Sequence, residues 1–597
     1  MPPLANLPSL SGVLAATIAA VEAEGVRLLQ EFCLPGGPRG SGSKAPIDDE
    51  IELRLRQALM RAFPCRFVGE ETGETAGSIE DWCWLVDPHD ATSDFLKGRR
   101  GSAISVGLLH GSDAVLGVVH VPASPDRGRD TFAWAEGAGP PTRNGLPVRS
   151  DLRSGSIGAG KFVFATAGSG LRPVTFSRAV APARFLAIAS VAHRMARVAM
   201  GDGIATLSIH PVAEYDIAAG AALVRAAGGV VLDFGGSNVV FTGRRGAQVN
   251  GCFAGAPEAA AQLARFDWDA IRSEERLVER ISTGFPKIAD ARRLARAQGC
   301  LLGQAIGDSL GSLVEFRSSG EIARLYAGGV RELADGGPWN TIAGQPTDDT
   351  EMALALARSM VAAGGYDTRG ALEAYRAWIA TAPADIGRTT RAALSGEPDG
   401  SSESNGSLMR ASPLGIAAAG DPARAAANAR ADAALTHPNP VCLESGAAFA
   451  AAISAGVAGA DPDAMLEVAL AHCSGPAREV IARAASGETV RDFTTHPGWV
   501  LIALQNAFFH LTHAAEFESA LVATVGAGND SDTNGAIAGA LLGASIGIQA
   551  IPRRWVRAVL SCRPLSEANA PRPRPMHYWP DDLLELAEAL LHIAPRA

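Results

Sequence analysis

The hydrophobic pattern near the start of the chain has the period of a helix. Leu14, Ile18, Val21 and Leu28 recur at helical spacing, which predicts an amphipathic helix that ends near the Pro-Gly-Gly at Pro35. A second helical segment is predicted for residues 48–63. Two helices therefore precede the first run of strand character.

Beyond these helices the period changes to that of strands. Residues 82–86 form a short apolar run that ends at Asp87, and this run predicts a buried strand. Residues 104–109 are predicted to pair with residues 114–121 across a four-residue turn. Later, helical residues 216–227 lead through a Gly-Gly pair into the strand-like residues 230–232. The first half of the chain is thus predicted to mix helices and strands.

The second half contains no comparable strand pattern. The charged segment 266–290, which includes Pro286, is predicted to be a linker. After it, Ala/Leu-rich helical segments alternate with Gly, Pro, Asp and Asn breaks, at residues 294–310, 351–363, 369–382, 423–435, 443–457, 464–472, 499–512 and 534–551. We therefore predict a mixed α/β domain over residues 1–265 and an all-α domain over residues 291–597.

Length and charge agree with two folded domains. A chain of 597 residues is too long for one ordinary hydrophobic core, and 47% hydrophobic with 19% charged residues is typical of a globular protein. A formal net charge of -10 disfavours a large surface for nucleic acid, although a local basic pocket could still bind a small anion.

The cysteines and the apolar runs predict a cytoplasmic protein without a membrane segment. The eight cysteines are dispersed and form no close pair of the metal or redox type, which fits a reducing compartment. The first ten residues lack the basic and apolar regions of a signal peptide. Residues 535–551 are uncharged, but they are short for a span and are interrupted by Ser545 and Gln549, so we expect a buried helix there.

Carboxylates gather around the end of the predicted strand in the first domain. Asp87 and Asp90 flank His89, and their hard oxygen donors suit Mg²⁺. Glu70 follows another apolar stretch, and Asp216 begins a predicted helix. Each acid alone also fits a helix cap or a solvated turn, so the combination carries the prediction.

Three ordered motifs in this half resemble the inositol monophosphatase superfamily. They are Gly69-Glu70-Glu71, Asp87-Pro88-His89-Asp90-Ala91-Thr92 and Tyr215-Asp216-Ile217-Ala218-Ala219-Gly220, and the resemblance spans about residues 8–262. It implies a layered α/β phosphatase fold with Mg²⁺ bound by Glu70, Asp87, the His89 carbonyl, Asp90 and Asp216, and with Asp48 as an additional acid. It also implies that Thr92 and Glu70 activate the attacking water and that the amides of Ala91 and Thr92 hold the phosphate.

Two positions depart from the family pattern. Ala91 replaces the usual Gly, and Tyr215 replaces the usual Trp. The methyl group of Ala91 lies where the backbone would approach the phosphate. The half could therefore be a phosphomonoesterase acting on an inositol phosphate, a nucleotide or a phosphorylated ADP-ribose, or a non-catalytic ligand-binding or scaffold module. The retained acids favour catalysis, because clustered carboxylates are costly without a cation.

The second half contains two further acidic clusters. Thr347-Asp348-Asp349 precedes one predicted helix, and the segment with Asp530, Asp532 and Thr533 precedes another. Acids at a helix start can simply complement the helix dipole. Two such clusters, each leading a buried helix, could instead converge as oxygen ligands for two Mg²⁺ or Mn²⁺ ions.

Five ordered motifs in this half resemble the ADP-ribosylglycohydrolase family over about residues 291–592. Besides the two acidic clusters they are residues 303–311 with Glu315, residues 404–410, and Thr436-His437-Pro438-Asn439-Pro440. The resemblance implies an all-α fold with two divalent metals held by Thr347, Asp348, Asp349, Asp530, Asp532 and Thr533. These metals would bind the ribose hydroxyls and assist attack of water at the anomeric carbon.

The same resemblance implies roles around the cleft. Glu315 would lie near the scissile bond or control access to it, and Asp349 is a second catalytic candidate. Asn405 and Gly406 would line the ADP-ribose cleft; His437 is a candidate substrate contact, although a histidine in a helical core is more often structural. We expect a bifunctional hydrolase whose substrate is a small molecule or an ADP-ribosylated macromolecule. The sequence leaves the group released from ADP-ribose open.

Overall fold

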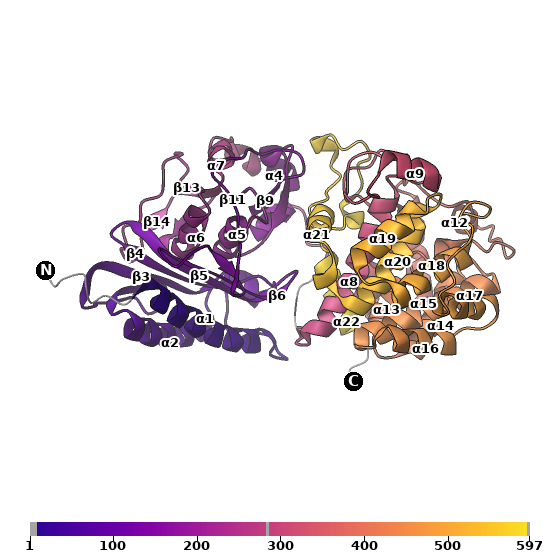
Figure 1. Ribbon diagram of the computed structural model, residues 1–597, viewed down its shortest axis with the longest axis horizontal. Helices are drawn as coiled ribbons and strands as arrows, with labels where there is room; N and C mark the ends of the chain where they lie inside the picture. The colour runs from indigo at the N-terminus through magenta and orange to yellow at the C-terminus, as the bar shows by residue number, and fades with distance from the viewer. Residues whose placement is uncertain (1–8, 282–283, 285, 594–597) are drawn as a thin grey trace. The chain divides into compact units, whose positions relative to one another are not determined.

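The computed structural model describes residues 9–281, 284 and 286–593. Contacts divide the chain into two compact units, Met1–Lys287 and Ile288–Ala597. Figure 1 shows a mixed helix and sheet unit in indigo to magenta and a helical unit in magenta to yellow.

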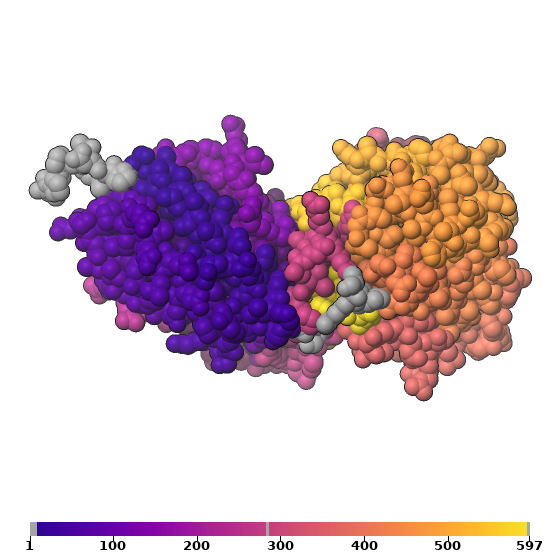
Figure 2. Space-filling model, turned by 90° about the horizontal axis from the view of Figure 1, so that it is seen from below, coloured from indigo at the N-terminus to yellow at the C-terminus, as the bar shows by residue number. Residues whose placement is uncertain are grey.

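The first unit is built around an eight-stranded sheet with the strand order β2-β1-β3-β4-β5-β6-β7-β8. Helices α1 (Leu10–Phe32) and α2 (Pro46–Ala62) cover one face, and their outer surface is the indigo surface of Figure 2. Helix α6 (Glu214–Ala226) covers the other face. The strands are β1 (Cys65–Gly69), β2 (Glu74–Thr75), β3 (Ile79–Asp90), β4 (Ala103–His110), β5 (Asp113–Ser124), β6 (Gly128–Ala135), β7 (Thr142–Arg143) and β8 (Leu146–Pro147).

A second sheet in this unit has the order β10-β9-β11-β15-β13. Helices α5 (Val191–Ala199) and α6 contact both sheets, whereas α4 (Pro173–Val180) and α7 (Pro257–Ala264) pack on the second sheet (Figure 1). The remaining elements are α3 (Thr92–Leu96), β9 (Phe162–Ala165), β10 (Arg184–Ala187), β11 (Ala205–Ser208), β12 (Val212–Ala213), β13 (Val230–Leu232), β14 (Gln248–Val249) and β15 (Cys252–Gly255). The predicted layered α/β architecture is confirmed.

The predicted local elements of this unit are present, with one informative extension. The predicted hairpin forms between β4 and β5, with Leu109 opposite Ala114. Strand β3 continues past the predicted end to Asp90, and its register with β4 shifts between Asp87 and Asp90. Such an irregularity re-aims side chains at the end of a strand. Part of the predicted linker also packs on this unit, since Trp268 is buried against Phe176 and Phe253.

The second unit is all-helical among its described residues, as predicted, apart from isolated bridges. Its helices are α8 (Ala291–Gly311), α9 (Ser319–Leu325), α10 (Asp348–Ala363), α11 (Thr368–Ile379), α12 (Arg388–Leu394), α13 (Ser412–Ala417), α14 (Pro422–Ala433), α15 (Pro440–Ala458), α16 (Pro462–Ala471), α17 (Gly475–Ala485), α18 (Val500–His513), α19 (Phe517–Gly526), α20 (Ser531–Ile546), α21 (Arg553–Leu560) and α22 (Leu583–His592).

Glycines bring α8 and α20 into backbone contact at the centre of this unit. A Cβ added to Gly303 would lie 2.1 Å from the Gly539 carbonyl oxygen, and one added to Gly307 would lie 2.0 Å from that of Gly535. Only glycine permits an approach this close. The two helices run antiparallel along this contact, so the end of α8 lies beside the start of α20, where Asp532 is found.

One described helix is long and apolar enough to cross a membrane by length and composition. This helix is α15, and 78% of its most apolar window is buried inside the protein. The segment predicted as a buried helix, residues 535–551, lies largely in α20, which is buried from Ser531 to Ser545. That helix ends at Ile546, before Gly547 at φ 80°, and is therefore shorter than predicted.

Candidate functional site

Three carboxylates converge in the first unit. One oxygen each from Glu70, Asp87 and Asp216 lies within 4.8 Å of the others. Strands β1 and β3 are parallel neighbours with Gly69 opposite Val86, so the residues that follow these two, Glu70 and Asp87, lie side by side where β1 ends. Asp216 joins them from the first turn of α6, where its carboxylate accepts a hydrogen bond from the amide of Ala213 at 3.0 Å.

The electrostatics of this group suit a cation. Burial and the neighbouring acids raise the pKa of Glu70 to about 7. Burial, then repulsion from neighbouring carboxyl groups that include Asp90, holds the pKa values of Asp87 and Asp216 well above the usual range. A divalent ion would remove that repulsion, and hard carboxylate oxygens are the donors that Mg²⁺ prefers. The residues present therefore fit such an ion.

Asp90 lies outside this group of three. Its carboxylate accepts hydrogen bonds from the Ser190 hydroxyl at 2.6 Å and the Ala192 amide at 2.8 Å, at the start of α5. Burial raises its pKa, and these two hydrogen bonds oppose the rise. Its charge still acts on Glu70 and Asp216, so the predicted ligand is a near neighbour of the group.

His89, Thr92 and Asp48 are joined to one another by short polar contacts. The His89 Nδ1 atom lies 2.7 Å from Asp48 Oδ1. The Thr92 hydroxyl donates to the His89 carbonyl oxygen at 2.7 Å and lies 3.3 Å from Asp48 Oδ2. The predicted water-orienting hydroxyl and the predicted carbonyl ligand are thus hydrogen-bonded to each other.

Two features around this site were not identified from the sequence. Glu52 is fully buried and accepts from the amides of Glu71 at 2.8 Å and Thr72 at 2.7 Å, which fixes the turn that carries Glu70. The sequence signal for Glu52 was the presence of an acid on the apolar face of the predicted helix 48–63. Ala91 has a φ of 77°, in the left-handed region that favours glycine.

The second unit contains an acidic group of its own. One oxygen each from Glu315, Asp385 and Asp532 lies within 4.8 Å of the others. Burial and the neighbouring acids raise the pKa of Glu315 to about 8, and burial raises that of Asp385 to about 6. Asp385 was missed because it lies in the loop between α11 and α12, outside every motif that we recognised.

The Thr347-Asp348-Asp349 cluster lies at the start of α10 and is held by Asp308. The Asp308 carboxylate accepts from the Thr347 amide and hydroxyl, both at 2.9 Å, and from the Thr350 amide at 3.0 Å. The Asp349 Oδ1 atom is buried and has no hydrogen-bond partner among the described residues. Since a buried carboxylate oxygen without a partner is costly, this atom fits a bound cation.

The two predicted acidic clusters are brought together. Repulsion from Asp308 and Asp530 contributes to the raised pKa of Asp349, and repulsion from Glu315 and Asp349 contributes to that of Asp532; burial is the larger cause in both. A side-chain hydrogen bond with Thr533 opposes the rise in the pKa of Asp349. Asn405 donates to Asp530 Oδ2 at 2.6 Å, so the predicted cleft residue contacts a predicted ligand.

His437 packs against Gly406. A Cβ added to Gly406 would lie 3.0 Å from the His437 Nε2 atom. The ring is buried, with Nδ1 at 2.8 Å from the Thr436 hydroxyl, and its Nε2 has no partner among the described residues. Burial lowers the pKa of His437 to about 3, so the imidazole is neutral near neutral pH.

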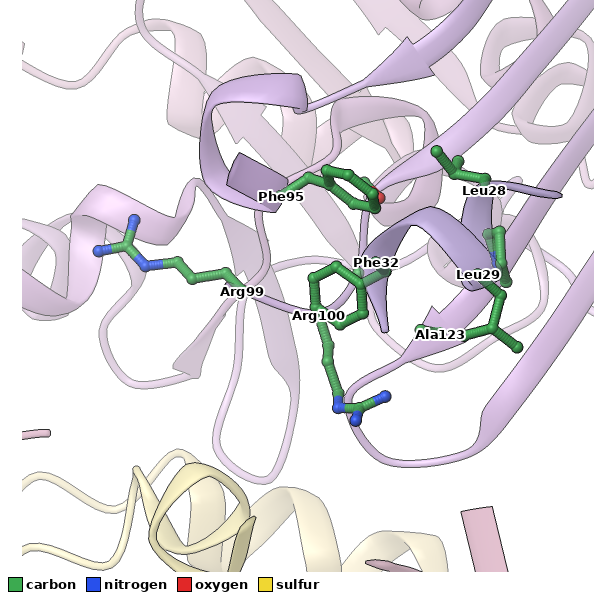
Figure 3. Close-up of a pocket in the computed structure, with 10 residues that line it drawn as sticks. Leu28, Leu29, Phe32, Phe95, Arg99, Arg100 and Ala123 are labelled. Carbon is green, nitrogen blue, oxygen red and sulfur yellow. The ribbon is translucent and has the colours of Figure 1, made fainter. Parts of the chain in front are cut away.

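A small cavity in the first unit is separate from these groups. Its lining includes Leu28, Phe32, Phe95, Arg99 and Arg100 (Figure 3) and contains none of the predicted metal ligands. Its volume is about 10 Å³, roughly what one water molecule needs. The cavity is therefore too small for a nucleotide or a sugar phosphate.

Comparisons with known proteins identify both halves. The ADP-ribosylglycohydrolase family model matches residues 289–596, and the inositol monophosphatase family model matches residues 41–271. The ADP-ribosyl-dinitrogen reductase glycohydrolase of Rhodospirillum rubrum is 33% identical over 280 residues, which cover 44% of this chain and 89% of that protein.

Two further relatives match one half each. The ADP-ribosylarginine hydrolase Tri1 of Pseudomonas putida is 28% identical over 320 residues, which cover 51% of this chain and 80% of that protein. ImpA of Mycobacterium tuberculosis, described as a probable inositol 1-monophosphatase, is 30% identical over 216 residues, which cover 33% of this chain and 74% of that protein. The chain is a hydrolase that belongs to the ADP-ribosylglycohydrolase family and carries, before that domain, a domain of the inositol monophosphatase family.

Proposed function

We propose that residues 291–597 hydrolyse the N-glycosidic bond between ADP-ribose and an arginine side chain. The observation that carries the proposal is the convergence of Glu315, Asp385 and Asp532 within 4.8 Å. Such a group of carboxyls suits divalent cations, which would hold the ribose while the leaving group departs. The name of the Pseudomonas putida relative, an ADP-ribosylarginine hydrolase, supports arginine as that leaving group.

The proposed metal ligands are the six residues named from the sequence, Thr347, Asp348, Asp349, Asp530, Asp532 and Thr533. When bound, two Mg²⁺ or Mn²⁺ ions would supply positive charge at the ribose hydroxyls and lower the pKa of a water. Asp308 orients the Thr347 hydroxyl, and Asn405 orients the Asp530 carboxylate. Glu315 accepts a hydrogen bond from the Trp339 indole at 2.5 Å. It lies next to Asp532 and Asp385.

The test is product identification with the intact protein. ADP-ribosylarginine, incubated with full-length protein and Mg²⁺ or Mn²⁺, should give free arginine and ADP-ribose by mass spectrometry. Asp349→Asn and chelation by EDTA should each abolish the reaction. Persistence of full activity in Asp349→Asn, or no turnover of any ADP-ribosyl conjugate by the metal-loaded wild type, would reject the proposal.

We propose a second activity, Mg²⁺-dependent phosphomonoester hydrolysis, for the inositol monophosphatase domain. The convergence of Glu70, Asp87 and Asp216 favours this activity over a non-catalytic role. Their pKa values are raised, so ionising these carboxyl groups costs free energy unless a cation is bound. Thr92 would orient the attacking water, supported by its contact with Asp48, and Glu70 would accept the proton from that water. The amides of Ala91 and Thr92 would hold the phosphate.

A panel of inositol phosphates, nucleotides and phosphorylated ADP-ribose tests this second activity. Phosphate release by the wild type and its loss in Asp87→Asn are expected. Calorimetric binding of these compounds without any turnover would instead favour a binding module. If one substrate serves both domains, Asp90→Asn and Asp348→Asn should each change the products formed from phosphorylated ADP-ribose; unchanged products in both variants would exclude the shared substrate.

A further inference from the structure

Phe316 occupies an unusual position directly after Glu315. Its φ is 66°, in the left-handed region, and the residue is 67% exposed. A bulky side chain seldom adopts this backbone conformation, and here one does so at an exposed position. Strained residues of this kind persist where the surrounding structure holds them, often at functional sites.

Backbone hydrogen bonds hold Phe316 to the loop that carries the acids of α20. The Phe316 amide donates to the Asn529 carbonyl oxygen at 2.9 Å, and the Asn529 amide donates to the Arg317 carbonyl oxygen at 2.8 Å. A Cβ added to Gly528 would lie 2.4 Å from that same Arg317 oxygen, so glycine allows the close approach. The position of Phe316 is thus tied to that of Asp530 and its neighbours.

A second aromatic ring lies beside the first. The Trp339 ring centroid is 6.0 Å from that of Phe316, with an interplanar angle of 70°. The Trp339 indole N–H donates to Glu315 Oε2 at 2.5 Å, and the Trp339 carbonyl oxygen accepts from Arg572 at 3.0 Å. One ring is therefore fixed against Glu315, while the other is open to solvent.

We infer that Phe316 and Trp339 form the subsite for the leaving group and bind its guanidinium. The faces of aromatic rings attract cations, and a planar guanidinium can stack on a ring as well. Trp339 is hydrogen-bonded to Glu315, which belongs to the group with Asp385 and Asp532, so the two rings adjoin the acidic group. This inference rests on the proposed arginine hydrolase activity. It assigns the selectivity for arginine to two residues that are not among the proposed metal ligands.

A purely structural role for Phe316 makes an opposite prediction. A packing residue contributes stability, so its removal should lower the melting temperature. Phe316→Gly removes an exposed ring and relaxes a left-handed backbone, so it should leave the melting temperature unchanged or raise it. Loss of function without loss of stability is the result expected of a binding residue.

The experiment compares Phe316→Gly, Phe316→Tyr and, as a control, Leu325→Ala in the full-length protein with Mn²⁺. Leu325 is also exposed, at 58%, but it lies in α9 and takes no part in the acidic group. The measurements are kcat and KM for ADP-ribosylarginine, and inhibition by free L-arginine and by L-lysine. Lysine carries the same charge without a planar group, so it isolates the contribution of stacking.

Phe316→Gly should lower kcat/KM about ten-fold and weaken inhibition by arginine about as much, while inhibition by lysine changes less. Phe316→Tyr should restore wild-type behaviour, and Leu325→Ala should match the wild type. Unchanged arginine inhibition in Phe316→Gly, or an equal loss for arginine and lysine, would overturn the inference. Absence of turnover in the wild type would instead show that the proposed function is wrong.

Discussion

His89 Nδ1 lies 2.7 Å from Asp48 Oδ1, and both side chains are buried. The contact joins the exit of strand β3 to the first turn of helix α2. Asp48 also accepts from the Ala45 amide at 3.2 Å, and the His89 ring stands edge-on to Phe95 with centroids 4.3 Å apart. The imidazole therefore orients the carboxylate that faces Thr92.

Replacement of His89 should impair this orientation. His89→Leu should lower kcat of phosphate release about ten-fold with little change in KM, because a hydrogen bond to a buried carboxylate contributes about 1.5–3 kcal/mol. His89→Asn, whose amide can still donate to Asp48, should recover part of the rate. Steady-state kinetics with the best phosphomonoester substrate measures both. A change in KM alone, or no difference between the two variants, would argue against the role of His89.

Ala91 should behave as a strained residue. A left-handed φ costs an L-residue about 1–2 kcal/mol, whereas the extra flexibility of glycine costs about 0.5–1 kcal/mol. Ala91→Gly should therefore stabilise the first unit slightly, by up to about 1 kcal/mol, and raise phosphatase kcat/KM by removing the methyl group near the proposed phosphate position. Urea unfolding and kinetics measure the two effects.

Asp81 provides the matched control for Ala91. It has a φ of 63° at the other end of β3, in an exposed position. Asp81→Gly should change stability without changing phosphatase activity. A drop in stability or in activity for Ala91→Gly would show that the methyl group is used in the site.

Metal removal should make stability depend on pH. Burial holds the pKa of Asp385 near 6, those of Glu70 and Asp308 near 7 and that of Glu315 near 8, all above the usual values of these side chains. Groups whose pKa is raised by folding bind more protons in the folded state, so stability falls as pH rises through this range. In EDTA, the melting temperature should therefore decrease between pH 5 and pH 8.

Bound metal should reverse this decrease, because a cation neutralises the ionised carboxylates. Scanning calorimetry with and without Mn²⁺ should give a metal-induced rise in melting temperature that is larger at pH 8 than at pH 5. A rise that is the same at both values would mean that these carboxyl groups do not bind the ion.

The glycine contact between α8 and α20 should tolerate no side chain. A methyl group at position 303 would lie 2.1 Å from the Gly539 carbonyl oxygen, so Gly303→Ala must push the helices apart. We expect a loss of about 3 kcal/mol in urea unfolding and a loss of glycohydrolase activity, because Glu315 and Asp532 depend on this packing.

Gly320 is the control for this substitution. It lies in α9, and a Cβ there would meet nothing within 4 Å. Gly320→Ala should be neutral or slightly stabilising, since alanine favours a helix. Equal effects of the two substitutions would show that the close helix contact contributes little.

The class of each half and most of the local elements can be predicted from the sequence alone. The helical spacing from Leu14 to Leu28 predicts α1, and the apolar run before Asp87 predicts the core of β3. The motifs also named Glu70, Asp87, Asp216, Glu315 and Asp532, which converge in two groups. Periodicity and motif order depend only on residues that are neighbours along the chain, so both can be recognised without knowledge of the fold.

Which acids meet, and which residues hold them, depends on packing between distant parts of the chain. Asp385 lies in a loop without a motif, yet it lies within 4.8 Å of Glu315 and Asp532. Glu52 supports the turn of Glu70 from another element, and Phe316 keeps a left-handed backbone because the Asn529 loop holds it. Periodicity shows which face of an element is buried, but the partner of that face is fixed by packing between residues far apart in the chain, and here by backbone contacts that glycines allow.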